Sequence, residues 1–82
     1  MLCFFNLAGA IHDPDVEGIE MESLAAAREA AVRAIADCIR DQPEVIWSGQ
    51  ELRMEVTDSS QLIVSTVIVF GIDSPATANA KP

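Results

Sequence analysis

The nine residues from Leu62 to Phe70 constrain this chain more than any other segment. The run contains no charged residue and no proline, and most of its side chains are β-branched or aromatic, which favours a β-strand. An uncharged strand of this kind at the edge of a sheet invites pairing with other molecules. We therefore expect residues 62–70 to lie in the centre of a sheet, between two other strands.

Two further segments predict the neighbouring strands. Residues 51–57 alternate between apolar and polar side chains, and the turn-forming residues 58–61 that follow predict a hairpin with the uncharged run. Residues 2–8 predict a strand that ends at Gly9. Its side chains divide between two faces, with Cys3, Phe5 and Leu7 on one and Leu2, Phe4 and Asn6 on the other.

An amphipathic helix is predicted over residues 24–40. Ser23 is placed to cap its first turn, and Pro43 prevents its extension. Apolar residues recur at steps of three and four and form one stripe: Leu24, Ala27, Ala31, Ile35, Cys38 and Ile39. A stripe of this width covers one face of a sheet.

These elements predict an α+β fold, with a three-stranded, mainly antiparallel sheet in the order β-α-β-β and the helix packed on one face. Its 82 residues are enough for one small domain, which we assign to residues 1–72. Residues 73–82 have no apolar pattern and predict a loose C-terminal tail. The segment 16–21 is a candidate for a short additional edge strand.

The charge of the chain excludes several classes of function. Thirteen acidic and five basic residues give a net charge of −8, and no two basic residues are adjacent. Binding to nucleic acid or to an anionic membrane requires clustered cations, so neither is expected. No apolar run is long enough to cross a membrane, and no cation precedes Arg28, so we expect a cytoplasmic protein without a signal peptide. Two cysteines, Cys3 and Cys38, predict buried thiols, with a reactive thiol as the alternative.

The ordered pieces of the chain resemble a family. Phe4-Phe5-Asn6-Leu7, Asp15-Val16-Glu17-Gly18, Ala26-Ala27-Arg28-Glu29-Ala30 and the hairpin of residues 54–58 with 62–70 follow one another over residues 3–70. In this set and order, the chain is similar to a family of short bacterial proteins known as domain of unknown function 6894. The resemblance implies an order of elements and no established activity.

Three local patterns are candidates for chemistry. Asp13, Asp15 and Glu17, followed by Gly18, match the opening of a calcium loop, but Leu24 stands where that loop requires a bidentate glutamate. We therefore predict a solvated acidic loop and no metal or other cofactor, with calcium as the alternative. His12 and Cys3 have no third group to orient them as a nucleophilic pair. Trp47 predicts a lid on the core, with a ligand-stacking platform as the alternative.

The proposed role follows from the number of layers. One helix covers one face of the sheet, so the other face is expected to expose an apolar patch made of Leu2, Phe4, Ile63, Val67 and Val69. Exposed patches of this kind mark interaction sites. We expect a non-catalytic interaction module that binds a protein partner or forms a homodimer through this face or through an edge strand. An antitoxin-like or RNA-contacting regulator is the alternative, and we do not expect an enzyme.

Overall fold

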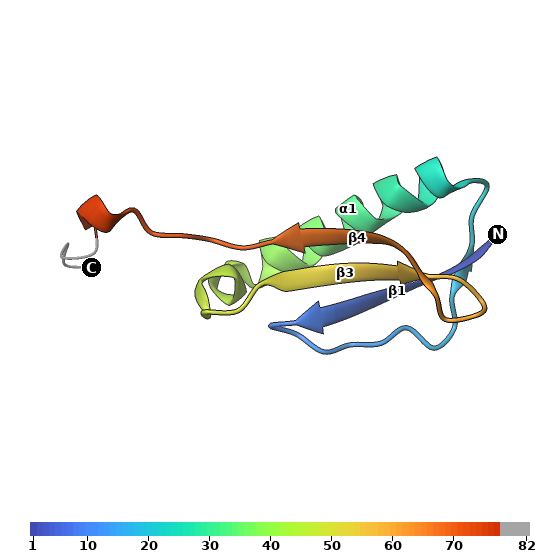
Figure 1. Cartoon of the computed structure of the whole chain (residues 1–82), viewed down its shortest axis with the longest axis horizontal. Helices are drawn as coiled ribbons and strands as arrows, with labels where there is room; N and C mark the ends of the chain where they lie inside the picture. The colour runs from blue at the N-terminus through green and yellow to red at the C-terminus, as the bar shows by residue number, and fades with distance from the viewer. Residues whose placement is uncertain (78–82) are drawn as a thin grey trace.

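One α-helix lies across one face of an antiparallel sheet in the computed structural model, which describes residues 1–77 (Figure 1). The strands are β1 (Leu2–Gly9), β2 (Ile19–Glu20), β3 (Leu52–Thr57) and β4 (Ile63–Val69), and the helix α1 is Leu24–Asp41. Short 3-10 helices follow at Pro43–Trp47 and Pro75–Thr77. The α+β class and the antiparallel sheet are confirmed. No helix in this part of the chain is both long enough and apolar enough for a membrane span.

The number of strands differs from the prediction. The sheet has four strands in the order β2-β1-β3-β4, where three were expected. The additional strand β2 is only two residues long and pairs with the start of β1, so that Leu2 lies opposite Glu20 and Cys3 opposite Ile19. It lies within the segment that the sequence marked as a candidate edge strand.

The position of the uncharged run was predicted wrongly. β3, and not β4, lies between two long strands, and β4 forms an edge of the sheet. The inward side chains of β3 explain this order, because Leu52, Met54 and Val56 are only 0%, 3% and 0% exposed beneath α1. In β4 the middle positions are the polar Ser65 and Thr66, so this strand has less apolar surface to bury against the helix.

The helix and the first strand follow their predicted patterns. Ser23 caps α1 by accepting a hydrogen bond from the backbone N–H of Ala26 at 3.1 Å. The buried residues of the helix are Ala27, Ala31 and Ile35, all in the predicted stripe. On β1, Cys3 is fully buried, and Phe5 and Leu7 pack against the same core.

A β-bulge changes which side chains of β4 face the helix. Ser65 lies opposite Val56 while Ile63 lies opposite Thr57, so Val64 is an extra residue in β4. Val64, Val67 and Val69 all pack against the core. The prediction that Val67 and Val69 face outward is therefore wrong, since the extra residue reverses the alternation, while Ile63 does face outward and is 57% exposed.

The chain leaves the body of the protein after β4. We call residues 71–77 the C-terminal arm, which Figure 1 shows running away from the sheet in the direction of β4. The arm is irregular up to its short 3-10 helix. The rest of the predicted tail, residues 78–82, lies outside the described residues.

Candidate interaction surface

One edge of the long-stranded part of the sheet is covered by the chain, and the other edge is open. The edge of β1 is covered by the loop that precedes α1, which runs antiparallel to it. Leu7 and Asp13 exchange backbone hydrogen bonds of 3.0 Å in both directions, and β2 covers the start of the strand. Beyond β4, no strand pairs with the outer edge among residues 1–77.

Asp15 holds this loop against the edge of β1. One carboxylate oxygen, Oδ2, accepts a hydrogen bond from the backbone N–H of Phe5 at 3.1 Å. The other, Oδ1, accepts from the backbone N–H groups of Glu17 at 3.0 Å and Gly18 at 3.1 Å. Burial alone would raise the pKa of Asp15, but these three N–H donors outweigh it and hold the pKa below its ordinary value.

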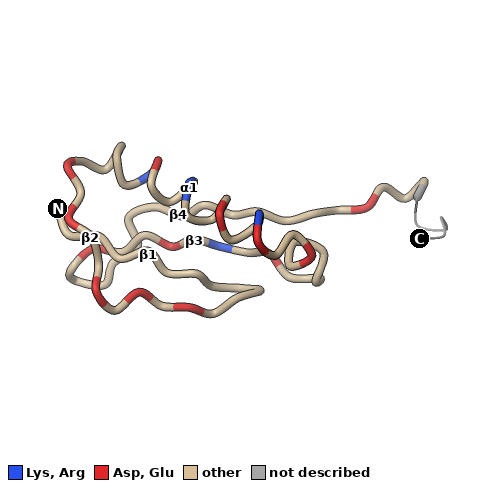
Figure 2. Tube along the Cα trace, turned by 180° about the vertical axis from the view of Figure 1, so that it is seen from behind, with Lys and Arg blue, Asp and Glu red and all other residues tan. Residues whose placement is uncertain are grey.

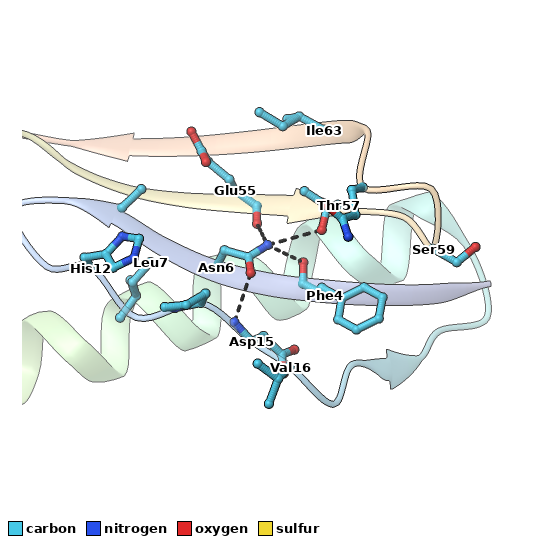
Figure 3. A pocket seen from close by; sticks show the side chains of 13 residues that line it. Phe4, Asn6, Leu7, His12, Asp15, Val16, Glu55, Thr57, Ser59 and Ile63 are labelled. Carbon is cyan, nitrogen blue, oxygen red and sulfur yellow. Dashed lines mark hydrogen bonds between the residues drawn. The ribbon is translucent and has the colours of Figure 1, made fainter.

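Asn6 completes the connection from the outer face of the sheet. Its side-chain amide donates to the carbonyl of Glu55 at 3.1 Å and to the hydroxyl of Thr57 at 3.2 Å, and its Oδ1 accepts from the backbone N–H of Asp15 at 2.9 Å (Figure 3). Asn6 therefore joins the loop, β1 and β3 at one point. The side-chain amide of Asn6 therefore stabilises the contact between the loop and the sheet.

The three acidic residues of the calcium pattern are not gathered around one point. Both carboxylate oxygens of Asp15 already accept backbone N–H groups, and Asp13 lies further along the strand, opposite Leu7. Within residues 1–77, no group of three or more His, Cys, Asp or Glu side chains is placed to hold a metal ion. Asp15 and Gly18 instead form a turn in which the aspartate side chain accepts backbone hydrogen bonds from the residues that follow it. Gly18 has the positive φ of 75° that such a turn favours.

The centre of the outer face is polar, and its charged side chains pair with one another. On β3, Arg53 forms ion pairs with Glu51 at 2.6 Å and with Glu55 at 3.2 Å. The hydrogen bonds that the Arg53 guanidinium donates to the carboxylates of Glu51 and Glu55 raise the pKa of Arg53. The pKa of Glu51 is lowered, first by its own backbone N–H and then by Arg53. This cluster contains one cation and two carboxylates, so it offers no free cation to an anionic ligand.

A groove of about 660 Å³ lies on the outer face between the loop and the hairpin turn. Figure 3 shows Phe4 and Asn6 on β1, His12 and Val16 on the loop, and Ile63 above them. His12 makes no hydrogen bond to another residue of the described chain. Cys3 is buried on the opposite, helix-facing side of the sheet, so the structure does not bring these two residues together.

Both thiols are free, and neither is fully exposed. Cys3 is buried and Cys38 is half-buried. Burial is the largest cause that raises the pKa of the Cys38 thiol, and the nearby carboxylates of Asp41 and Asp13 add to it. A raised pKa lowers the thiolate fraction, which is the reactive form.

The predicted surface patch is only partly present. Leu2 is 37% exposed and Phe4 is half-buried beside Gly18. Val67 and Val69 belong to the helix-facing side, as described above. Val16, Ile19 and Val32 are exposed singly on other elements, and a longer series of exposed apolar side chains lies along β4 and the start of the C-terminal arm: Leu62, Ile63, Ile68, Phe70 and Ile72. Sequence reasoning missed Ile68 and Phe70 because the bulge cannot be read from the alternation.

Trp47 extends this apolar strip. It is 60% exposed, so the prediction that it is a lid on the core is wrong. Its ring lies directly over Gly71, where any side chain would meet it. Next to it, a hollow of about 440 Å³ is lined by Ile46, Gln50, Ile68 and Phe70, among others. The residues of the 3-10 helix that do pack against the core are Val45 and Ile46.

The comparisons with known proteins agree with the resemblance seen in the sequence. The family described as Domain of unknown function (DUF6894) has a model that matches residues 2–71. The matched segment includes all four strands and α1. The searches of curated proteins and of solved structures give no match.

Proposed function

The chain belongs to the family described as Domain of unknown function (DUF6894), and we propose that it is a non-catalytic interaction module that self-associates through the open edge of β4. The observation that carries this proposal is the contrast between the two edges of the sheet. The edge of β1 is covered by the loop that contains Asp13, by the carboxylate of Asp15 and by the short strand β2. Within residues 1–77, no loop or strand covers the outer edge of β4 in the same way.

The composition of β4 supports pairing along this edge. Open strands in monomeric proteins carry charged residues or proline that discourage pairing. Residues 62–72 contain neither, although the chain as a whole has a net charge of −8. Figure 2 shows the tube from β4 into the C-terminal arm in tan, and the next charged residue in the sequence is Asp73. Ile63, Ile68 and Phe70 are 57%, 53% and 58% exposed along it.

The charge distribution gives the RNA-contacting alternative no support. Three of the four arginines, Arg33, Arg40 and Arg53, form ion pairs with carboxylates of the same chain. Phosphate binding needs clustered cations that are free to replace counterions. Figure 2 shows the blue positions interspersed with red ones.

The proposal is tested by light scattering coupled to size-exclusion chromatography of the full chain at micromolar concentrations. We expect a dimer of twice the monomer mass of 8.8 kDa. Ile68→Lys places a charge on the open strand and should raise the dimer Kd about tenfold or more. The matched control is Val32→Lys on the solvent face of α1, because Val32 and Ile68 are both 53% exposed.

Two results would contradict the proposal. One is a wild-type protein that stays monomeric up to about 100 µM, a weak limit for specific association. The other is an equal effect of Ile68→Lys and Val32→Lys on the dimer, which would show that the added charge acts without regard to position.

A further inference from the structure

We infer that the occupant of the β4 edge is a second copy whose pairing is confined to residues 66–70, with Ile68 facing Ile68 of the partner subunit at the two-fold axis. This inference rests on the proposed function and adds to it the residue at the axis. Two copies of one strand that pair about an axis perpendicular to the sheet run antiparallel. Thr66 of each copy then lies opposite Phe70 of the partner subunit.

The hydrogen-bonding pattern of the sheet identifies the free backbone groups of β4. Ala10 donates its backbone N–H to the carbonyl of Glu51, so Glu51 turns its backbone groups toward β1. The direction of these groups alternates along a strand, so Leu52 turns toward β4, where Val69 lies opposite it. Val69 therefore points toward β3. By the same alternation, three residues at this end of β4 point to the open edge: Thr66, Ile68 and Phe70.

The β-bulge ends this regular edge on one side. Val64 is the extra residue, and Leu62 turns its carbonyl into its own hairpin, where it accepts the backbone N–H of Asp58 at 3.0 Å. The residues before Ser65 are therefore out of phase with those after it, and we exclude them from the pairing. On the other side, Asp73 is the first charged residue after β4.

An axis at Ile68 pairs all three free residues with one another. Ile68 faces its own counterpart, and Thr66 faces Phe70 in both halves of the pair. Thr66 lies opposite Glu55 within the chain and Ile68 opposite Arg53, so these side chains are on the outer face of the sheet. Ile68 and Phe70 are 53% and 58% exposed there. A β-branched side chain facing an aromatic one is a stabilising cross-strand pair.

The neighbouring registers satisfy fewer groups. Moving the axis one residue toward the hairpin would place Phe70 opposite Val64 in the bulge, where the regular alternation has ended. Moving it one residue toward the C-terminal arm would place Asp73 opposite Ser65 and remove its charge from water, which is costly. The axis at Ile68 avoids both.

The size of this interface predicts a weak dimer. Each of the three facing pairs exchanges two hydrogen bonds, which gives about six. Protein interfaces contain about one hydrogen bond per 100–200 Å², so about six correspond to roughly 600–1,200 Å² of buried surface. Specific interfaces begin near about 1,000 Å², and transient ones lie at or below this size. We therefore expect a dissociation constant in the micromolar range.

The experiment is a disulfide between two copies of the same single-cysteine chain. Ile68→Cys is introduced into a Cys38→Ser chain, in which the remaining Cys3 is buried. Residues that face each other in a hydrogen-bonded pair have Cα atoms about 5.5 Å apart, which is within the range that a disulfide spans. We expect mild oxidation to convert most of this chain to a covalent dimer on a non-reducing gel.

The matched control is Thr66→Cys in the same Cys38→Ser chain, because Thr66 is also exposed on the outer face of β4. Under the proposed register the two copies of residue 66 lie about 13 Å apart along the seam, so this variant should cross-link at least tenfold more slowly. If the wild type is a dimer but Ile68→Cys links no faster than Thr66→Cys, the inference is overturned and the proposed function remains. If the wild type is a monomer, both are overturned.

A charge swap tests the same axis without cysteine. Ile68→Lys and Ile68→Glu should each weaken the dimer, because like charges then face each other. Mixing the two variants in equal amounts brings opposite charges together and should lower the apparent Kd at least tenfold relative to either variant alone. The same mixture of Val32→Lys and Val32→Glu should show no gain. Two Ile68 variants that associate no better together than apart would overturn the axis.

Discussion

Replacing Asp15 with alanine should destabilise the protein by about 2 kcal/mol, because two partly buried backbone N–H groups lose a charged acceptor and each such bond contributes about 1 kcal/mol. These groups belong to Phe5 and Gly18. The third donor, the N–H of Glu17, is exposed and is rehydrated when the carboxylate is removed, so it adds little. The loss should appear in urea unfolding followed by far-UV circular dichroism at one fixed protein concentration.

The same contact predicts the pH dependence of stability. The pKa of Asp15 is lowered in the folded protein from an ordinary value of 3.8. Its stabilisation is therefore fully present above that ordinary value and is lost as the pH falls through the lowered pKa of the folded state. The difference in unfolding free energy between the wild type and Asp15→Asn should stay constant from pH 7 to about pH 5 and shrink below about pH 4.

Glu17→Gln is the matched control, because it removes one charge from the same loop and its carboxylate accepts no hydrogen bond from another described residue. This variant should stay within about 0.5 kcal/mol of the wild type. Equal losses for Asp15→Asn and Glu17→Gln, or a difference between wild type and Asp15→Asn that does not shrink in acid, would refute the role of Asp15 as the clamp of the loop.

Three other positions allow shorter tests. Gly9→Ala should destabilise the protein by about 2 kcal/mol or more, since Gly9 has a φ of 82° and its added carbon would overlap the carbonyl of Glu51; a melting temperature unchanged from wild type would contradict this. The rate at which the Cys38 thiol reacts with iodoacetamide should rise with pH around a midpoint pH above that of a free cysteine, because burial raises the pKa of the thiol; a midpoint pH at or below that of a free cysteine would be evidence against it. Gly71→Ala should displace the ring of Trp47 and shift its fluorescence, and an unchanged emission spectrum would show that the two are not in contact.

Features set by short-range patterns could be predicted from the sequence. The helix was expected at residues 24–40 and spans Leu24–Asp41, because Ser23, the apolar stripe and Pro43 each act within a few residues of the element they define. The faces of β1 and β3 were also predicted, since side chains on an unbroken strand alternate strictly.

Features that depend on distant partners could not be predicted. Alternation shows which side chains of a strand face the core, but it does not show which strand is its neighbour, and so β4 was placed in the centre. One extra residue at Val64 then reversed the orientation of Val67 and Val69. Trp47 was expected on the core, but the neighbouring Val45 and Ile46 occupy that side. For Asp15 a signal was present, because an aspartate three residues before a loop glycine is typical of a side-chain-closed turn.

The covering of β1 by residues 13–20 also limits how large an assembly can become. A sheet with two receptive sides can add subunits without end and grow into a fibre. Here the other side is occupied by the chain's own loop and ends in a strand of only two residues, so a neighbour that docks on β4 uses the only long open strand in the described part of the sheet. Growth then stops after a single addition, and the product is a finite particle instead of a polymer.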